Sequence, residues 1–294
     1  TSPGSRKVRA GTVIGKDEKM NSRHLVTTRV LGLIFGLWSV CATAQGTEAY
    51  VYCDIGDSLN DAIRMEGDWG RPLRLYVMGT CEERVTVPRH RVTIDGQPEE
   101  GGPIAILDGS IINWGSNIAI RNITITGDGV GVSASVGRTR LINVDISHND
   151  AEGIVISGGG AVFLNDSRVQ YNNLEGIAVE TGFLAVSNSE IGGNEIGIDA
   201  TMGRITLEET SVVENRGAGV IGRLHTSIAA NGPVTIEENG EHGVQLMFDS
   251  GFLAIGDVNI MDNGRFDVVC EDHESSAKFE GGHQGRVKCP GVRW

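Results

Sequence analysis

A repeat of 21 to 24 residues runs from Ala119 to Val268 and restricts the possible folds more than any other feature of this sequence. Seven times a branched aliphatic residue is followed three positions later by an amide or a carboxylate, and successive aliphatic positions lie 21, 23, 22, 21, 24 and 24 residues apart. Such a period is typical of a coil in which each turn stacks on the one before. The polar members of the repeat are Asp128, Asn149, Asn172, Asn194, Asn215, Asn239 and Asn263.

Two further positions keep the same register. Most repeats carry a glycine followed by an aliphatic residue shortly after the amide, as in Gly153-Ile154 and Gly176-Ile177, and a short polar residue or a Glu three positions before the aliphatic one. In these features the chain from about residue 74 to 268 resembles the right-handed parallel β-helix proteins, a superfamily that includes pectate lyases, polygalacturonases and alginate lyases. The resemblance implies an all-β fold, a right-handed single-stranded parallel β-helix with a short N-terminal capping helix, and a ladder of hydrogen-bonded amides at one corner.

Within one turn, strand alternation predicts that Leu184, Val186, Ile191 and Ile198 point inward and that Asp199 points outward. Asn tolerates a left-handed backbone better than most residues, so we expect the corner Asn itself to adopt that conformation.

The N-terminal region indicates export. Residues 1–19 are polar and form an unassigned leader, whereas residues 20–44 combine two arginines, the apolar run from Val30 to Val40 and the small residues Ala42-Thr43-Ala44. This order is typical of a secretory signal peptide, and an apolar run of this length is too short to span a membrane, which takes about 20 residues. The residues that precede Cys41 do not match those of a lipoprotein site. We expect a secreted or periplasmic bacterial protein with no membrane span after processing.

Four cysteines remain after the signal peptide: Cys53, Cys81, Cys270 and Cys289. In an oxidising compartment they allow three disulfide connectivities, of which we expect the local one, Cys53 with Cys81 and Cys270 with Cys289. The spacing does not favour a metal site, and we expect no cofactor. Ser58 is a candidate N-cap for a helix within Asp57 to Met65. The expected organisation is therefore an N-terminal cap at 45–73, a β-helix at 74–268 and a C-terminal cap at 269–294.

Charge narrows the choice of partner. Beyond residue 44 the chain carries 18 basic and 36 acidic residues, a net charge of −18. Nucleic acid is disfavoured, because phosphate binding requires a basic surface. An anionic polysaccharide is disfavoured less, since a local group of arginines could still bind one.

The alignment of turns offers no obvious active site. Calcium or a glycoside hydrolase would require several carboxylates on the outward side of the first sheet, where related enzymes have their active site. The aligned column has none, because it consists of Ala119, Arg140, Phe163, Ala185, Thr206, Ala229 and Ala254. On the second sheet we expect a solvated stripe with ion pairs between turns, made of Thr124, Asp145, Arg168, Glu190, Ser211, Thr235 and Asn259.

The turn from Gly222 to Pro233 is longer than its equivalents and supplies the remaining candidates. Arg223 and His225, with Arg140 and Asp199 on outward columns, could form an acid/base set for a lyase or an epimerase, in which a cation neutralises a uronate and a base removes a proton. A solvated, bulged turn explains the same residues.

Three functions follow from these observations. The first is a scaffold or binding module whose partner is a polysaccharide or a cell-surface protein. The second is a polysaccharide lyase or C5-epimerase acting on an acidic glycan. The third is a coil that binds another protein through an exposed sheet.

Overall fold

The computed structural model describes residues 46–65, 70–88, 91–96 and 104–290. The expected leader and signal peptide, residues 1–19 and 20–44, lie outside the described residues. Ala44–Trp294 forms one compact unit, and the account below concerns that unit alone.

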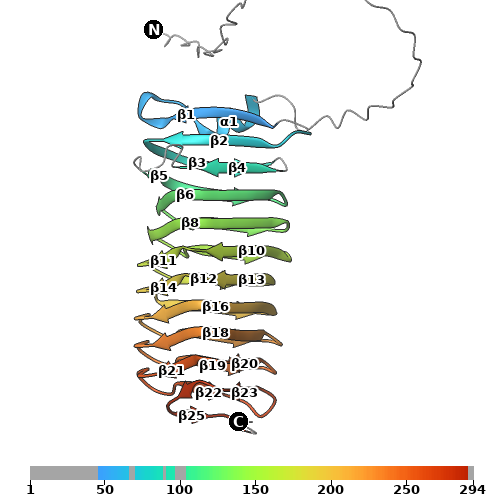
Figure 1. Ribbon diagram of the computed structural model, residues 1–294, viewed down its shortest axis with the longest axis vertical. Coiled ribbons are helices and arrows are strands. Elements are labelled where there is room, and N and C mark those ends of the chain that lie inside the picture. Colours follow the sequence, from blue (N-terminus) through green and yellow to red (C-terminus); the bar gives the residue numbers. More distant parts are fainter. Residues whose placement is uncertain (1–45, 66–69, 89–90, 97–103, 291–294) are drawn as a thin grey trace, which may run out of the picture. The chain divides into compact units, whose positions relative to one another are not determined.

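The described residues wind into a right-handed parallel β-solenoid of about 10 turns (Figure 1). Each strand pairs in parallel with the strand of the next turn, as β10 does with β13 and β13 with β16. The all-β parallel β-helix expected from the sequence is therefore confirmed.

The strands form three sheets that meet at corners, and the longer strands bend from one sheet into the next. The first sheet contains β1 (Thr47–Tyr52), β2 (Leu73–Met78), β4 (Val92–Asp95), β6 (Asn117–Gly127), β8 (Arg138–Asn149), β10 (Gly160–Asn165), β13 (Gly182–Ser187), β16 (Gly203–Val213), β18 (Ser227–Glu237), β20 (Gly251–Ile255) and β23 (Ser276–Glu280). The second contains the ends of β6, β8, β16 and β18 with β11 (Arg168–Gln170), β14 (Glu190–Gly192), β21 (Val258–Met261) and β24 (His283–Gln284). The third contains β7 (Val132–Ser135), β9 (Ile154–Ser157), β12 (Glu175–Val179), β15 (Ile196–Thr201), β17 (Val220–Arg223), β19 (Val244–Met247), β22 (Val268–Cys270) and β25 (Val287–Lys288). Two early strands, β3 (Thr80–Val87) and β5 (Ala105–Asn113), pass from the second sheet into the third.

The core fills the centre of the coil. Most inward positions of the strands carry an aliphatic residue, and equivalent residues of successive turns stack in a column. Leu184, Val186, Ile191 and Ile198 are all at most 1% exposed, as their alternation predicts. Burying one such side chain contributes about 1.5 to 3 kcal/mol. The same column arrangement repeats in every turn, so the core is continuous along the coil.

A buried amide ladder joins the turns at the corner between the second and third sheets. The Nδ2 atom of Asn172 donates to Oδ1 of Asn194 at 3.0 Å, and Asn194 donates to Asn215 at 3.2 Å. The backbone N–H of each Asn donates to the same oxygen in the next turn, as Asn172 does at 2.9 Å. The ladder runs through Asn149, Asn172, Asn194, Asn215, Asn239 and Asn263.

Two details of the expected ladder are wrong. The left-handed residue is the one before each Asn, for example Tyr171 with φ 55° and Glu214 with φ 55°, because the Asn must keep its amide directed inward. Asp128 is not a member: it is exposed, and the Oδ1 atom of Asn149, the first rung, is buried without a hydrogen-bond partner.

The ladder ends on a residue that lies outside the sequence repeat. Asp267, 2% exposed, accepts hydrogen bonds from the backbone N–H and Nδ2 of Asn263 at 3.1 and 2.9 Å. It occupies the position of the repeated glycine, as Gly243 does one turn earlier. Burial alone raises the pKa of Asp267, but hydrogen bonds from the Arg286 backbone and from Asn263 outweigh it and leave the pKa lowered.

Both ends of the coil carry the expected disulfides, Cys53–Cys81 and Cys270–Cys289. The helix α1 (Leu59–Met65) follows a 3-10 turn, η1 (Cys53–Ile55), and buries Leu59 and Ile63 in the core. Ser58 caps α1, because its Oγ accepts the Asp61 N–H at 3.3 Å. Parallel pairing extends from β1 to β25, and the coil therefore includes parts of the segments expected as caps.

Replacing a ladder amide should destabilise the protein far more than replacing its neighbour. Asn172→Ala leaves buried groups of two adjacent turns unpaired, and we expect a loss on the order of 3 kcal/mol in the free energy of unfolding. Asn173→Ala, at an exposed residue whose side chain donates a hydrogen bond to Asp150, should change it by about 0.5 kcal/mol or less. Urea unfolding followed by circular dichroism measures both, and equal losses would show that the ladder is not a major stabilising element.

Asp267 predicts a pH effect at the end of the ladder. A carboxyl group with a lowered folded pKa contributes stability that is complete above its unfolded pKa of about 3.9 and is lost as the pH falls through the folded value. Asp267→Ala should therefore destabilise the protein at pH 7 and much less in strong acid. Asp267→Asn, which keeps one acceptor oxygen, should retain part of the stability. Unfolding midpoints measured from pH 2 to 7 test this, and a pH-independent loss would contradict it.

Candidate functional site

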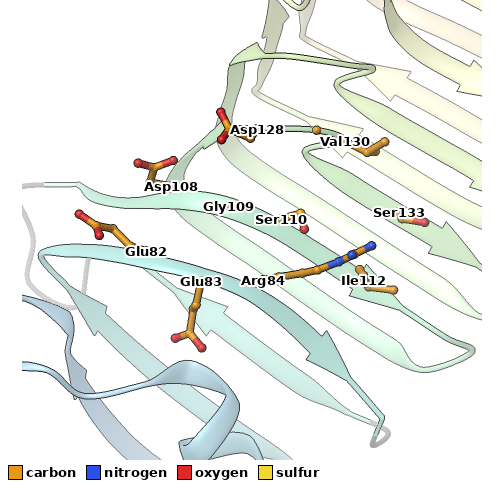
Figure 2. Close-up of a pocket in the computed structure, with 11 residues that line it drawn as sticks. Glu82, Glu83, Arg84, Asp108, Gly109, Ser110, Ile112, Asp128, Val130 and Ser133 are labelled. Carbon is orange, nitrogen blue, oxygen red and sulfur yellow. The ribbon is translucent and has the colours of Figure 1, made fainter.

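A cleft of about 540 Å³ opens over the early turns, where the amide ladder has not yet begun (Figure 2). Figure 2 shows Glu82, Asp108 and Asp128 along one end of the cleft, with Arg84 extending away from them. Glu82 and Asp108 are direct partners on β3 and β5. The cleft therefore combines a short column of carboxylates with one guanidinium group.

Glycine bends explain why these turns differ. At Gly109, with φ 155°, a Cβ atom would lie 2.1 Å from the Glu83 carbonyl oxygen, and at Gly127, with φ 137°, it would lie 2.7 Å from the Gly109 nitrogen. Only glycine allows the strands to pass each other so closely. The corner is made by backbone here, and the carboxylates of Asp108 and Asp128 face solvent.

The cleft does not assemble a recognisable reaction centre. In the part of the chain that the structure describes, no group of three or more His, Cys, Asp or Glu side chains is placed to hold a metal ion. Glu83, the remaining carboxylate, is occupied in accepting hydrogen bonds from Ser58 and Leu59 at the start of α1. Its function is to fix the cap.

The second sheet has the expected stripe but not the expected ion pairs. Arg168 is aligned with Asp145 on one side and with Glu190 on the other. Neither carboxylate forms an ion pair with it in the described structure, and Oδ1 of Asp145 is buried without a hydrogen-bond partner. A second cleft of about 490 Å³ covers these residues and the left-handed corner residues beside them. It has an excess of acidic groups.

The sequence candidates Asp199 and Arg223 do meet, on the outward side of the third sheet. The Nη2 atom of Arg223 lies 3.0 Å from Oδ2 of Asp199. Burial raises the pKa of Asp199, Arg223 opposes the increase and Glu175 adds to it, with a raised pKa as the result. Neither residue lines one of the two clefts.

The other two sequence candidates lie apart from this pair. His225 has left-handed φ 62° and its Nδ1 lies 3.0 Å from Asp249 of the next turn, at an exposed corner. Arg140 belongs to the first sheet and is four turns away from Ala229, the residue of the His225 turn that shares its column. Four turns correspond to roughly 19 Å. The proposed acid/base set is therefore not brought together around one sugar.

The extra length of the Gly222–Pro233 segment is divided between two corners. Thr201 and Arg204 are separated by three positions, whereas their partners Arg223 and Ser227 are separated by four. A second extra residue precedes Val234. The segment is thus ordered and adds no wall beside a sheet.

Asp199 is expected to weaken the fold at neutral pH. A raised folded pKa means that stability is greatest below the unfolded pKa of about 3.9 and decreases as the pH rises through the folded value. Asp199→Asn should therefore be more stable than the wild type at pH 7 and equal to it near pH 3. Thermal unfolding at both values measures this. A loss of stability at pH 7 would show that the Arg223 ion pair outweighs burial.

The outward face of the first sheet is rich in arginine and phenylalanine. The central outward column of this sheet is the one expected from the sequence as far as Ala229. The next outward residue is Leu253, whereas Ala254, which was expected there, is buried. A register error of one residue moves a side chain to the opposite face of a strand. The flanking columns supply Arg121, Arg138 and Arg204, which sequence analysis did not single out.

These arginines have no acidic partners in the part of the chain that the structure describes. Arg121, Arg138, Arg140 and Arg204 take part in no ion pair among the described residues. The Arg138 guanidinium lies 5.2 Å from the centre of the Phe163 ring, which is 5.6 Å from Phe183. The Nε atom of Arg121 is buried and lacks an acceptor. We call Arg121, Arg138, Arg140, Arg204, Phe163 and Phe183 the arginine face.

The fold and these surfaces define the chain as a right-handed parallel β-helix protein with a pectate lyase-like fold. Residues 108–222 match the family model described as "Right handed beta helix region". The solved structure of pectate lyase Pel9A is similar, with a TM-score of 0.57 and 12% identity over 86% of this chain and 80% of that one. The A-module of Azotobacter vinelandii mannuronan C-5 epimerase AlgE4 gives a TM-score of 0.46 and 15% identity over 79% of this chain and 71% of that one.

At this level of identity the structural likeness concerns the fold alone. No curated protein sequence matches this chain. Within the described ranges, no helix has the length and apolar character needed to cross a membrane.

Proposed function

We propose that this chain is an exported β-helix module that binds an anionic polysaccharide along the arginine face. The proposal is carried by four arginines on one sheet of a strongly acidic chain, none of which forms an ion pair with a carboxylate among the described residues. Arginine binds carboxylates through a planar fork of donors and also stacks on aromatic rings. Unpaired guanidinium groups beside phenylalanines provide both interactions for a uronate polymer.

Export is supported by the two disulfides and by the expected signal peptide at 20–44. Disulfides persist in oxidising compartments, where bacterial surface and extracellular polysaccharides are also found. A binding role is favoured over lyase or epimerase chemistry, because that chemistry requires a cation and a base within hydrogen-bond reach of one sugar. Asp199 and Arg223 are ion-paired with each other outside both clefts, and Arg140 and His225 lie apart from them.

Removing two arginines from the face should weaken binding of polygalacturonate. For Arg138→Ala combined with Arg140→Ala, we expect an affinity loss of about two- to thirtyfold, since exposed ion pairs are worth about 0.2 to 1 kcal/mol each. Added salt should reduce the wild-type affinity in the same direction. Affinity electrophoresis and calorimetry measure both effects.

The matched control is Arg168→Ala combined with Arg216→Ala, which removes the same charge from other exposed positions. Equal losses in the two double variants would indicate non-specific attraction and refute the arginine face as the site. Ultraviolet-absorbing unsaturated products in the same incubations would instead support the lyase alternative.

A further inference from the structure

A group of tyrosines lies beside the arginine face, at the first turns of the coil. Tyr50 and Tyr52 on β1 have ring centres 6.5 Å apart, and Tyr50 stacks on Tyr76 of β2 at 5.0 Å, with the ring planes inclined by 22° and 25°. The chain contains four tyrosines, and three of them are in this group. We call Tyr50, Tyr52 and Tyr76 the tyrosine group.

Polar contacts hold the ring of Tyr76, on which Tyr50 stacks. Asp95, which is 4% exposed, accepts a hydrogen bond from Nη2 of Arg74 at 2.8 Å, and the Arg74 guanidinium lies 4.8 Å from the centre of the Tyr76 ring. The hydroxyl of Tyr76 donates to Glu48 at 3.5 Å. A ring fixed in this way loses little conformational entropy when a ligand binds.

The rings are not needed to fill the core. Val51, Leu75 and Val77 occupy the inward positions of the same strands and are at most 1% exposed, whereas Tyr50 is 57% and Tyr52 46% exposed. Stacked, rigid and exposed aromatic rings provide apolar surface with polar edges, which suits the C–H face of a sugar ring.

The position of the group links it to the arginine face. Tyr76 is aligned with Asp95 and Asp95 with Arg121, all on the outward side of the first sheet. Two turns separate Tyr76 from Arg121, which is roughly 10 Å. A polymer lying along the sheet would contact both groups.

We propose that the tyrosine group is a sugar-stacking platform that binds pyranose rings of the same polysaccharide whose carboxylates contact the arginine face. This inference rests on the proposed function. It gives the bound polysaccharide a second contact, which does not depend on charge. Stacking uses the ring face of the sugar, so it persists when the carboxylates of the polymer are esterified. The arginine contacts do not.

The experiment compares polygalacturonate with highly methyl-esterified pectin in affinity electrophoresis of the full chain. Tyr50→Ala should weaken binding of both polymers by about three- to tenfold, in keeping with the usual worth of an aromatic contact. Tyr50→Phe, which keeps the ring, should bind like the wild type. Tyr171→Ala is the matched control, because Tyr171 is 52% exposed and lies at the corner between the second and third sheets, directly before Asn172.

The outcomes separate the two proposals. Normal binding by Tyr50→Ala, with weakened polygalacturonate binding by the arginine double variant, overturns the platform and leaves the proposed function standing. Weakened binding of both polymers by Tyr50→Ala but unchanged binding by the arginine variant supports the platform and overturns the arginine face. Binding of neither polymer by the wild type overturns both. Urea unfolding of each variant checks that the fold is retained.

Discussion

The buried amide ladder is the interaction on which the rest of the structure depends. The Oδ1 atom of Asn194 accepts the backbone and side-chain N–H groups of Asn172 in the preceding turn, and a turn that placed its Asn out of register would leave buried amides of two turns unpaired. The repeated glycine enforces the same register, since a Cβ atom at Gly176 would lie 2.7 Å from Nδ2 of Asn194. Turns tied in this way cannot accept long insertions at that corner. Surfaces made by side-chain columns are therefore what this coil offers a ligand.

This regularity is why the sequence predicted the fold so well and the ends of the ladder so poorly. The period and the inward aliphatics follow from spacing that repeats, and the disulfide pairing follows from the grouping of the cysteines near the two ends of the sequence. Asp128 satisfies the same spacing and yet lies outside the ladder, because Gly127 bends the backbone before it. Asp267 breaks the spacing and yet completes the ladder, because its carboxylate reaches the amide of Asn263. A sequence repeat therefore identifies the residues within the amide ladder but not the residues at its two ends.

The arginine face could be predicted only in part, for a different reason. Net charge averages over all faces, so the acidic total conceals the four arginines of the arginine face, which form no ion pair among the described residues. Arg140 could be recognised from the sequence because it lies on the central column of the sheet. Arg138 and Arg204 lie on a flanking column, which the repeat does not mark. The tyrosine group precedes the regular repeat, and the stacking of Tyr50 on Tyr76 depends on the pairing of β1 with β2. Such contacts require the register of two strands whose sequences do not repeat.

The same architecture supports the proposed binding role more than a catalytic one. The corners that the structure describes add no walls that exclude water, and charges acting through water gain little from each contact. Catalytic charge stabilisation depends on a site from which water is excluded. A polymer, however, can add one weak contact per turn along the coil, and contacts on one chain reinforce each other because each is made at high effective concentration. Arginines and aromatic rings spread over successive turns of one sheet are therefore a more effective arrangement for holding a polysaccharide than for cleaving it.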